Sequence, residues 1–294
     1  MAISVATPNP NSRASRRRAS RSLSVGSRVL WHVVMIVVAV LMIAPLLWMM
    51  ATSLRTQATV FSGPPIPTSI VFDAYVHAWR DLQIWRNLLN SILITGVSVA
   101  LIVFSSVLGG YAFARLRFAG RNVLFAIVVS ALFLPAVATL IPVYLELKSM
   151  GLLGTQLGLI FVYVAGGIPF SVFLMRSFFE GLPRELTEAA RIDGANDWQI
   201  FVRVMVPLAL PGIATIAIFQ MLSVWNELLF ASALISDHGL SPLQPAADSL
   251  VGEFGTDYPG LAAVMTLSAL PMVLAYLVFQ RWFVAGLTAG AVKA

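Results

Sequence analysis

The polar segment Glu188-Ala-Ala-Arg-Ile-Asp-Gly194, followed thirteen residues later by Pro207, lies between two strongly apolar parts of the chain. Pro183 suits the first position of a helix, because its missing N–H would have no partner there. A helix of about 11 residues is therefore predicted over 183–193, at a rise of about 1.5 Å per residue. Gly194 then ends this helix, since glycine takes left-handed backbone angles without a Cβ clash.

A second short helix is predicted immediately after this glycine. Asn196 can cap it, and Gln199, three residues further on, supplies the partner of a capping box. Two short helices would then meet at a corner, where the small Ala190 and Gly194 let another backbone come close. A corner of this kind between membrane spans is expected to contact a partner protein.

The composition excludes an ordinary soluble domain, because 59% of the 294 residues are apolar and only 11% are charged. The chain has no cysteine, which excludes disulfides and thiolate metal sites, and its three histidines are scattered along the sequence. Its two lysines, Lys148 and Lys293, lie outside any P-loop sequence. If ATP is used, another chain must bind it, so no cofactor or metal is expected on this one.

Six apolar runs predict an all-α membrane protein with six transmembrane helices. The predicted spans are 29–51, 87–112, 123–145, 157–175, 208–235 and 261–284. The first run is too long for the apolar part of a signal peptide. Residues 1–28, rich in Ser and Arg, are expected to form a basic disordered extension. The remaining parts are a membrane domain over 29–284 and a short tail over 285–294.

The positions of the basic residues predict the orientation in the membrane. If the N-terminus is cytoplasmic, four of the 19 Lys and Arg residues lie outside and the remaining 15 lie inside. This asymmetry fits the positive-inside rule and places the corner and both termini in the cytoplasm. The net charge of +6 is then explained by membrane orientation rather than by nucleic-acid binding.

The fifth predicted span contains the unusual run Trp225-Asn226-Glu227. A carboxylate deep in an apolar span is costly and usually faces a cavity or a partner. The Asn and Trp beside it could hydrogen-bond to a sugar ring and stack on it. Alternatively, Glu227 lies near the outer interface and is satisfied by a neighbouring helix. The candidates for pore-lining residues are Trp225, Asn226, Glu227, Gln220, Ser223 and Thr266.

The corner resembles the signature loop of ABC importer permeases, in which Glu-Ala-Ala is followed by Gly and then by a Leu-Pro end. Val204 and Val206 replace the Ile and Leu of that pattern and keep its apolar bulk. The resemblance implies that the loop over 178–207 is a coupling helix that docks on a cytoplasmic ATPase subunit. The implied coupling residues are Glu188, Ala189, Ala190, Asp193, Gly194 and Pro207.

Other segments resemble the maltose-type carbohydrate permeases, namely Asn90-Ser91, the run 110–115 and the tail 280–293. The resemblance extends over most of the chain from about residue 29. It implies a type I ABC importer permease fold, a sugar or oligosaccharide cargo and no enzymatic activity. It also implies a second permease subunit, two ATPase subunits that bind ATP and Mg, and an external sugar-binding protein.

The loop over 237–258 is acidic and long for a connection between adjacent spans. It can be a simple connector. In the similar maltose-type permeases, the corresponding loop reaches into the substrate-binding protein. The candidate contacts are Asp237, Asp248, Glu253, Asp257 and Tyr258.

Other functions remain open at this stage. The same importer class could carry glycerol-phosphate, a polyol or an amino-sugar, although a phosphate cargo would favour arginines in the central spans, which have none. An ATP-independent channel or secondary transporter would need paired intramembrane charges, and only Glu227 qualifies. A membrane enzyme lacks a convergent set of catalytic groups, because Glu188 and Asp193 would lie in open cytoplasm.

Overall fold

The computed structural model describes residues 25–291, except 63, 65–66, 68 and 253–254. Most of the basic extension predicted over 1–28, and Lys293, therefore lie outside the described residues. The chain divides into two compact units, residues 1–48 and 49–294. The first unit contains most of α1 (Val25–Ser53), whose apolar part agrees with the span predicted over 29–51.

Two long helices, α3 (Ile84–Arg115) and α6 (Gln156–Glu180), pack against each other through much of their length in the second unit. Their close approach depends on glycine. A Cβ atom at Gly110 would lie 2.5 Å from the Cβ of Met175, and one at Gly167 would lie 2.5 Å from the Cδ1 of Ile102. Gly110 and Gly167 thus let the two helix backbones approach closely.

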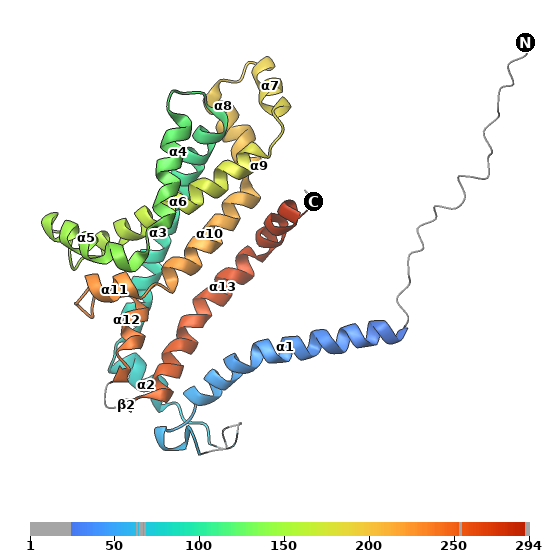
Figure 1. Ribbon diagram of the computed structural model, residues 1–294. Helices are drawn as coiled ribbons and strands as arrows, with labels where there is room; N and C mark the ends of the chain where they lie inside the picture. Colours follow the sequence, from blue (N-terminus) through green and yellow to red (C-terminus); the bar gives the residue numbers. More distant parts are fainter. Residues whose placement is uncertain (1–24, 63, 65–66, 68, 253–254, 292–294) are drawn as a thin grey trace, which may run out of the picture. The chain divides into compact units, whose positions relative to one another are not determined.

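The helices α10 (Leu210–Trp225) and α13 (Tyr258–Ala291) complete this bundle (Figure 1). α10 packs against α3, α6 and α13. Pro169 and Pro271 lie inside α6 and α13 without ending them. Both α3 and α6 are longer than their predicted spans, since each continues for several residues beyond its apolar stretch.

Two of the predicted spans are not straight: the third is bent within its length, and the fifth begins at a bend of 70° between residues 197–208 and α10. In the third, α4 (Arg121–Ser130) and the 3₁₀ turn η3 (Ala131–Phe133) meet α5 (Ala136–Ser149) at 105°. Pro135 stands at this break, where it favours an extended rather than a helical backbone. The described residues contain four helices that could cross a membrane, or six if each bent pair is one span. The total of six spans therefore stays a prediction.

The prediction of one continuous helix over 208–235 was wrong. α10 ends at Trp225, and α11 (Leu229–Leu234) begins after a short break. The Glu227 carboxylate accepts hydrogen bonds from the backbone N–H groups of Phe230 at 2.9 Å and Ala231 at 3.0 Å. These two N–H groups belong to the first turn of α11, where they have no acceptor within the helix, so the Glu227 carboxylate stabilises the start of this separate helix.

The connections at one end of the second unit also contain regular structure that the sequence analysis missed. The loop over 52–86 includes the 3₁₀ turn η2 (Gln57–Thr59) and α2 (Asp73–Arg80). The loop after α11 includes α12 (Leu243–Asp248) and a hairpin of β1 (Val251–Gly252) and β2 (Gly255–Thr256). These elements lie at the opposite end of the bundle from α7 (Glu185–Ile192) and α8 (Asp197–Ile200) (Figure 1).

Candidate functional site

The predicted corner is present, and we use this name for residues 185–200. Its first helix, α7 (Glu185–Ile192), begins two residues later than predicted. Gly194 has a φ of +83°. The N–H of Gly194 bonds to the carbonyl of Arg191, and that of Ala195 to the carbonyl of Ala190, both at 3.0 Å. This pair of bonds is a Schellman motif, which explains why glycine occupies this position.

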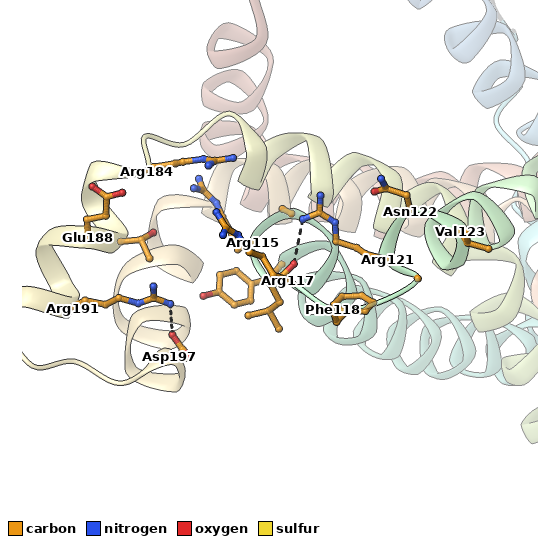
Figure 2. A pocket seen from close by; sticks show the side chains of 15 residues that line it. Arg115, Arg117, Phe118, Arg121, Asn122, Val123, Arg184, Glu188, Arg191 and Asp197 are labelled. Carbon is orange, nitrogen blue, oxygen red and sulfur yellow. Dashed lines mark hydrogen bonds and ion pairs between the residues drawn. The ribbon is translucent and has the colours of Figure 1, made fainter.

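The second helix, α8 (Asp197–Ile200), begins with the predicted capping box. The Gln199 N–H donates to Asn196 Oδ1 at 2.8 Å, and the Asn196 N–H donates to Gln199 Oε1 at 2.9 Å. Arg191 and Asp197 form an ion pair of 2.8 Å across the corner (Figure 2). The Asp197 carboxylate raises the pKa of Arg191, but both side chains are well exposed, so the pair adds little stability.

The corner is fixed to the membrane helices through an aromatic and aliphatic cluster. The Tyr111 ring of α3 lies 4.7 Å from that of Phe201 and 5.6 Å from that of Phe179 in α6, measured between ring centroids. Ile200 and Met205 are completely buried in the same cluster. A displacement of the corner would therefore be transmitted to α3 and α6, because tightly packed side chains transmit strain.

Arg115 strengthens this attachment at the end of α3. Its Nη2 donates to the carbonyls of Phe179 at 2.5 Å and Leu182 at 2.6 Å, at the C-terminal end of α6. A cation at this end of a helix is favourable, since the last carbonyls have no partner within the helix. This role of Arg115 was not predicted from the sequence.

The path from the corner to α10 is irregular. A π-helical turn (Phe201–Met205) leads into α9 (Val206–Leu208), and the segment 197–208 meets α10 at 70°. Pro207 lies exposed in α9, where its missing N–H prevents a regular helical ladder. The Leu-Pro-like end of the signature thus lies directly before the bend.

The outward surface of the corner combines small, charged and large apolar side chains. Glu188, Ala189 and Asp193 are exposed, and Ala190 is half-buried. Ile192 is 86% exposed and Trp198 is 66% exposed. Neither residue was predicted from the sequence as a contact, although a Trp in a polar segment was an available signal. Such exposed apolar groups on a rigid projection are suited to a protein contact.

Three of the residues predicted to line a pore, Gln220, Trp225 and Glu227, bind neighbouring helices through their side chains. Glu227 accepts a 2.7 Å bond from the Tyr163 O–H on α6, in addition to its two backbone partners. This arrangement is the alternative considered for Glu227, satisfaction by a neighbouring helix. Gln220 donates from Nε2 to Gly167 O at 3.1 Å and to Ser171 Oγ at 2.9 Å. Both residues connect α6 to the chain that follows the corner.

The other pore candidates differ in exposure. Trp225 is buried and donates its indole N–H to Ser268 Oγ at 3.2 Å. It also lines an apolar groove of 450 Å³ between α3, α10 and α13. Asn226 and Ser223 are exposed, and Asn226 donates to the carbonyl of Leu222. Thr266 bonds to the carbonyl of Ala262 within its own helix.

The predicted outer loop is held to the start of α3 by polar side chains that the sequence analysis had noted only as part of a resemblance. Asn90 Nδ2 donates to the carbonyls of Gly239 and Ser241, each at 3.0 Å, and Ser91 Oγ accepts from the Leu243 N–H at 2.8 Å. Asn87 adds two further bonds of the same kind. Residues 238–243 of the loop are therefore held against the bundle.

The acidic candidates in this loop serve partly local roles. Asp237 accepts from the Gly239 N–H at 2.8 Å, and Asp257 accepts from the Gly260 N–H at 3.0 Å at the start of α13. Asp248 is exposed, and Tyr258 packs edge-on against Phe61 with ring centroids 4.9 Å apart. Glu253 lies outside the described residues.

Residues 102–289 match the protein family described as the binding-protein-dependent transport system inner membrane component. The chain belongs to this family. The permease is therefore a transport subunit in a membrane and not an enzyme, and the predicted recognition is confirmed. The matched region includes the corner and both bent segments that follow α3.

Curated relatives align over nearly the whole permease. It is 34% identical over 265 residues to the diacetylchitobiose uptake system permease protein NgcG of Streptomyces coelicolor, covering 89% of this chain and 88% of that protein. It is 33% identical over 265 residues to the trehalose transport system permease protein SugB of Mycobacterium tuberculosis, covering 90% and 97%. Both relatives are named as permeases, which agrees with the predicted ABC importer class.

A solved structure supports the same fold. The permease is similar to a chain of a bacterial ABC transporter that imports the acidic polysaccharide alginate, with a TM-score of 0.74 and 28% identity. The similarity covers 87% of this chain and 96% of that chain. The predicted fold of a type I ABC importer permease is thus confirmed.

Proposed function

We propose that this permease carries a neutral sugar or oligosaccharide as one subunit of an ATP-driven importer. The names of its relatives support a saccharide cargo, since they refer to diacetylchitobiose and trehalose. A neutral cargo agrees with the lack of Lys and Arg from 87 to 114, 156 to 175 and 204 to 235. A glycerol-phosphate cargo would favour a basic residue in these stretches, so this alternative has less support.

The proposed complex contains a second, related permease, two ATPase subunits and an external sugar-binding protein. The family description supports the need for a binding protein. Neither lysine of this chain lies in a P-loop sequence, which supports binding of ATP and Mg by separate subunits. The asymmetry of basic residues supports a cytoplasmic corner and cytoplasmic termini.

The single observation that carries the coupling role is the corner itself, a rigid projection with exposed Ile192 and Trp198 and a buried attachment to α3 and α6. In the proposed mechanism, closure of the ATPase dimer moves the corner. The cluster around Tyr111 then carries the movement to α3 and α6, and the 70° bend carries it to α10. The partner must bind the corner with different affinity in the two states, because equal affinity would shift neither.

The elements at the opposite end are proposed to meet the binding protein. The exposed Asp248 and the partly exposed Tyr258 are available for such a contact, whereas the carboxylates of Asp237 and Asp257 already cap local backbone groups. At the pore, we expect the exposed Ser223 and Asn226 to be the more available candidates. Gln220, Trp225 and Glu227 are proposed to support the pore by holding its helices together.

The coupling role is tested with Gly194→Trp in the complete complex. The mutation places a bulky side chain at an exposed position of positive φ, and it is expected to reduce ATP-dependent uptake of radiolabelled oligosaccharide at least tenfold. Gly151→Trp is the matched control, because Gly151 also has a positive φ and free space around a Cβ atom, but lies between α5 and α6. The control is expected to retain uptake.

Three measurements decide the outcome. Co-purification of the ATPase subunits shows whether Gly194→Trp prevents assembly, and ATP hydrolysis shows whether it uncouples an assembled complex. Normal uptake by Gly194→Trp would contradict the coupling role.

Cargo is tested in vesicles by comparing a disaccharide with glycerol-phosphate, with and without ATP while ion gradients are maintained. Uptake that continues without ATP would contradict the importer mechanism.

A further inference from the structure

Five arginines surround a depression beside the corner, and we call this depression the arginine basin (Figure 2). It has a volume of 1280 Å³ and opens between the connection from α3 to α4 and the helix α7. Its basic lining residues are Arg115, Arg117, Arg121, Arg184 and Arg191. Its acidic lining residues are Glu188 and Asp197, so the lining has a clear excess of positive charge.

These guanidinium groups are not all neutralised by the protein. Arg191 pairs with Asp197, Arg121 donates to the carbonyl of Leu116 at 3.2 Å, and Arg115 is bound to α6. Within the described part of the chain, the side chains of Arg117 and Arg184 form no hydrogen bond or ion pair. The buried Nε of Arg115 also lacks a hydrogen-bond partner among these residues. The basin therefore offers the unpaired guanidinium groups of Arg117 and Arg184 to an anion.

The surroundings of the basin indicate which anion fits. Arg115 is the last residue of α3, which is long and apolar enough to cross a membrane, and Arg121 is the first residue of the largely apolar α4. Leu116, Phe118 and Val123 line the same basin and are exposed. A basic site with apolar neighbours at the end of a membrane helix matches the headgroup and adjoining chain of a lipid.

We propose that the arginine basin binds the phosphate group of an anionic membrane phospholipid. Arginine is suited to phosphate because its planar guanidinium forms paired, charge-assisted hydrogen bonds. A bound phosphate would lie between Arg117 of the α3–α4 connection and Arg184 at the start of α7, relieving the repulsion among the arginines. An acidic surface of the ATPase is the competing occupant. Ile192 and Trp198 do not line the basin and remain available for that partner.

Lipid binding has a consequence for transport that rests on the proposed coupling function. A phosphate held between the α3–α4 connection and α7 would stiffen the attachment of the corner to the membrane helices. The binding of lipid itself requires no coupling. Its test can therefore fail while the coupling role stands, and the reverse also holds.

The test uses the permease assembled with its partner subunits, purified in mild detergent and mixed with phosphatidylglycerol or phosphatidylcholine. Native mass spectrometry then counts the retained lipids. The wild type is expected to retain phosphatidylglycerol at least tenfold better than phosphatidylcholine. Arg117→Gln with Arg184→Gln is expected to reduce that retention by about fivefold for each arginine. The control pair, Arg80→Gln with Arg203→Gln, removes the same charge at exposed sites outside the basin and is expected to retain the lipid.

Four results would overturn the proposal: unchanged retention in the basin variant, an equal loss in the control, complete displacement by about 10 mM inorganic phosphate, or lipid binding that appears only after the ATPase is removed. Displacement by phosphate would assign the basin to a soluble anion, and binding only after removal of the ATPase would assign it to a protein surface.

If the basin variant does not assemble, a salt titration of the wild type replaces it. Retention of phosphatidylglycerol should then fall steeply between about 0.05 and 0.5 M NaCl because salt screens the arginines. Salt-independent retention would overturn the proposal.

Discussion

The permease contains two places where one helix ends and another begins within a few residues, and they are held by different kinds of contact. At the corner, Gly194 and the Asn196–Gln199 capping box complete the helix ends with partners no more than five residues away. At the break after Trp225, Glu227 caps α11 locally but also binds Tyr163, 64 residues earlier in α6. The helix ends of the first are completed by local bonds, whereas the second connects distant parts of the bundle through one carboxylate.

The largest effect is expected from Glu227→Leu. This change removes the cap of α11 and leaves the Tyr163 O–H and two backbone N–H groups without their acceptor. We expect a loss of about 3 kcal/mol in the free energy of unfolding, measured by chemical denaturation in detergent.

Glu227→Gln is the control for size and shape, since its amide oxygen can still accept hydrogen bonds. Tyr163→Phe removes only the long-range bond. If Tyr163→Phe lowered the free energy of unfolding as much as Glu227→Leu does, the local cap would contribute nothing. The distinction between the two breaks would then need revision.

A smaller effect is expected from Gly110→Ala, which tests the packing beneath the corner. The new Cβ atom would lie 2.5 Å from the Met175 Cβ and 2.9 Å from the Arg176 backbone N, so α3 and α6 must move apart. Overpacking of this kind costs about 1–3 kcal/mol. Thermal unfolding of the purified complex should show a lower midpoint.

Gly96→Ala is the matched control in the same helix, because a Cβ atom at Gly96 meets nothing within 4 Å. It should leave the midpoint unchanged or raise it slightly. Equal destabilisation by both substitutions would show that α3 tolerates neither alanine and would remove the evidence for a specific close contact at Gly110.

The smallest effect is expected from Asn196→Ala, which removes the side-chain cap of α8. Loss of an N-cap costs about 1 kcal/mol, and this cost should be confined to the corner. Hydrogen exchange of the Gln199 amide should become about fivefold faster, while amides in α6 should exchange as before.

Asn122→Ala is the control, because Asn122 is also exposed near a helix start but its side chain caps nothing within the described part of the chain. Faster exchange throughout α6 in Asn196→Ala would contradict the local character of the corner.

The corner was predictable because the interactions that form its helix ends are short-range. The stop at Gly194 and the capping box at Asn196 each depend on residues within one or two helical turns, and both predictions agree with the structure. The long apolar helices were predictable for a similar reason, since a run of about 20 apolar residues is itself the signal. The prediction of coupling awaits the Gly194→Trp experiment, and those of pore and binding-protein contacts stay predictions.

The sequence alone was sufficient for the membrane class, the glycine corner and the family resemblance, because composition, spacing and local hydrogen bonds decide them. It was insufficient for the bond between Glu227 and α6, the role of Arg115 and the gathering of the arginines around one basin. In each of these, the deciding partner is distant in the chain: Tyr163 for Glu227, Phe179 for Arg115, and Arg184 for Arg117. Such contacts exist only once α3 and α6 have packed, because packing brings together groups whose separation in sequence carries no periodic signal.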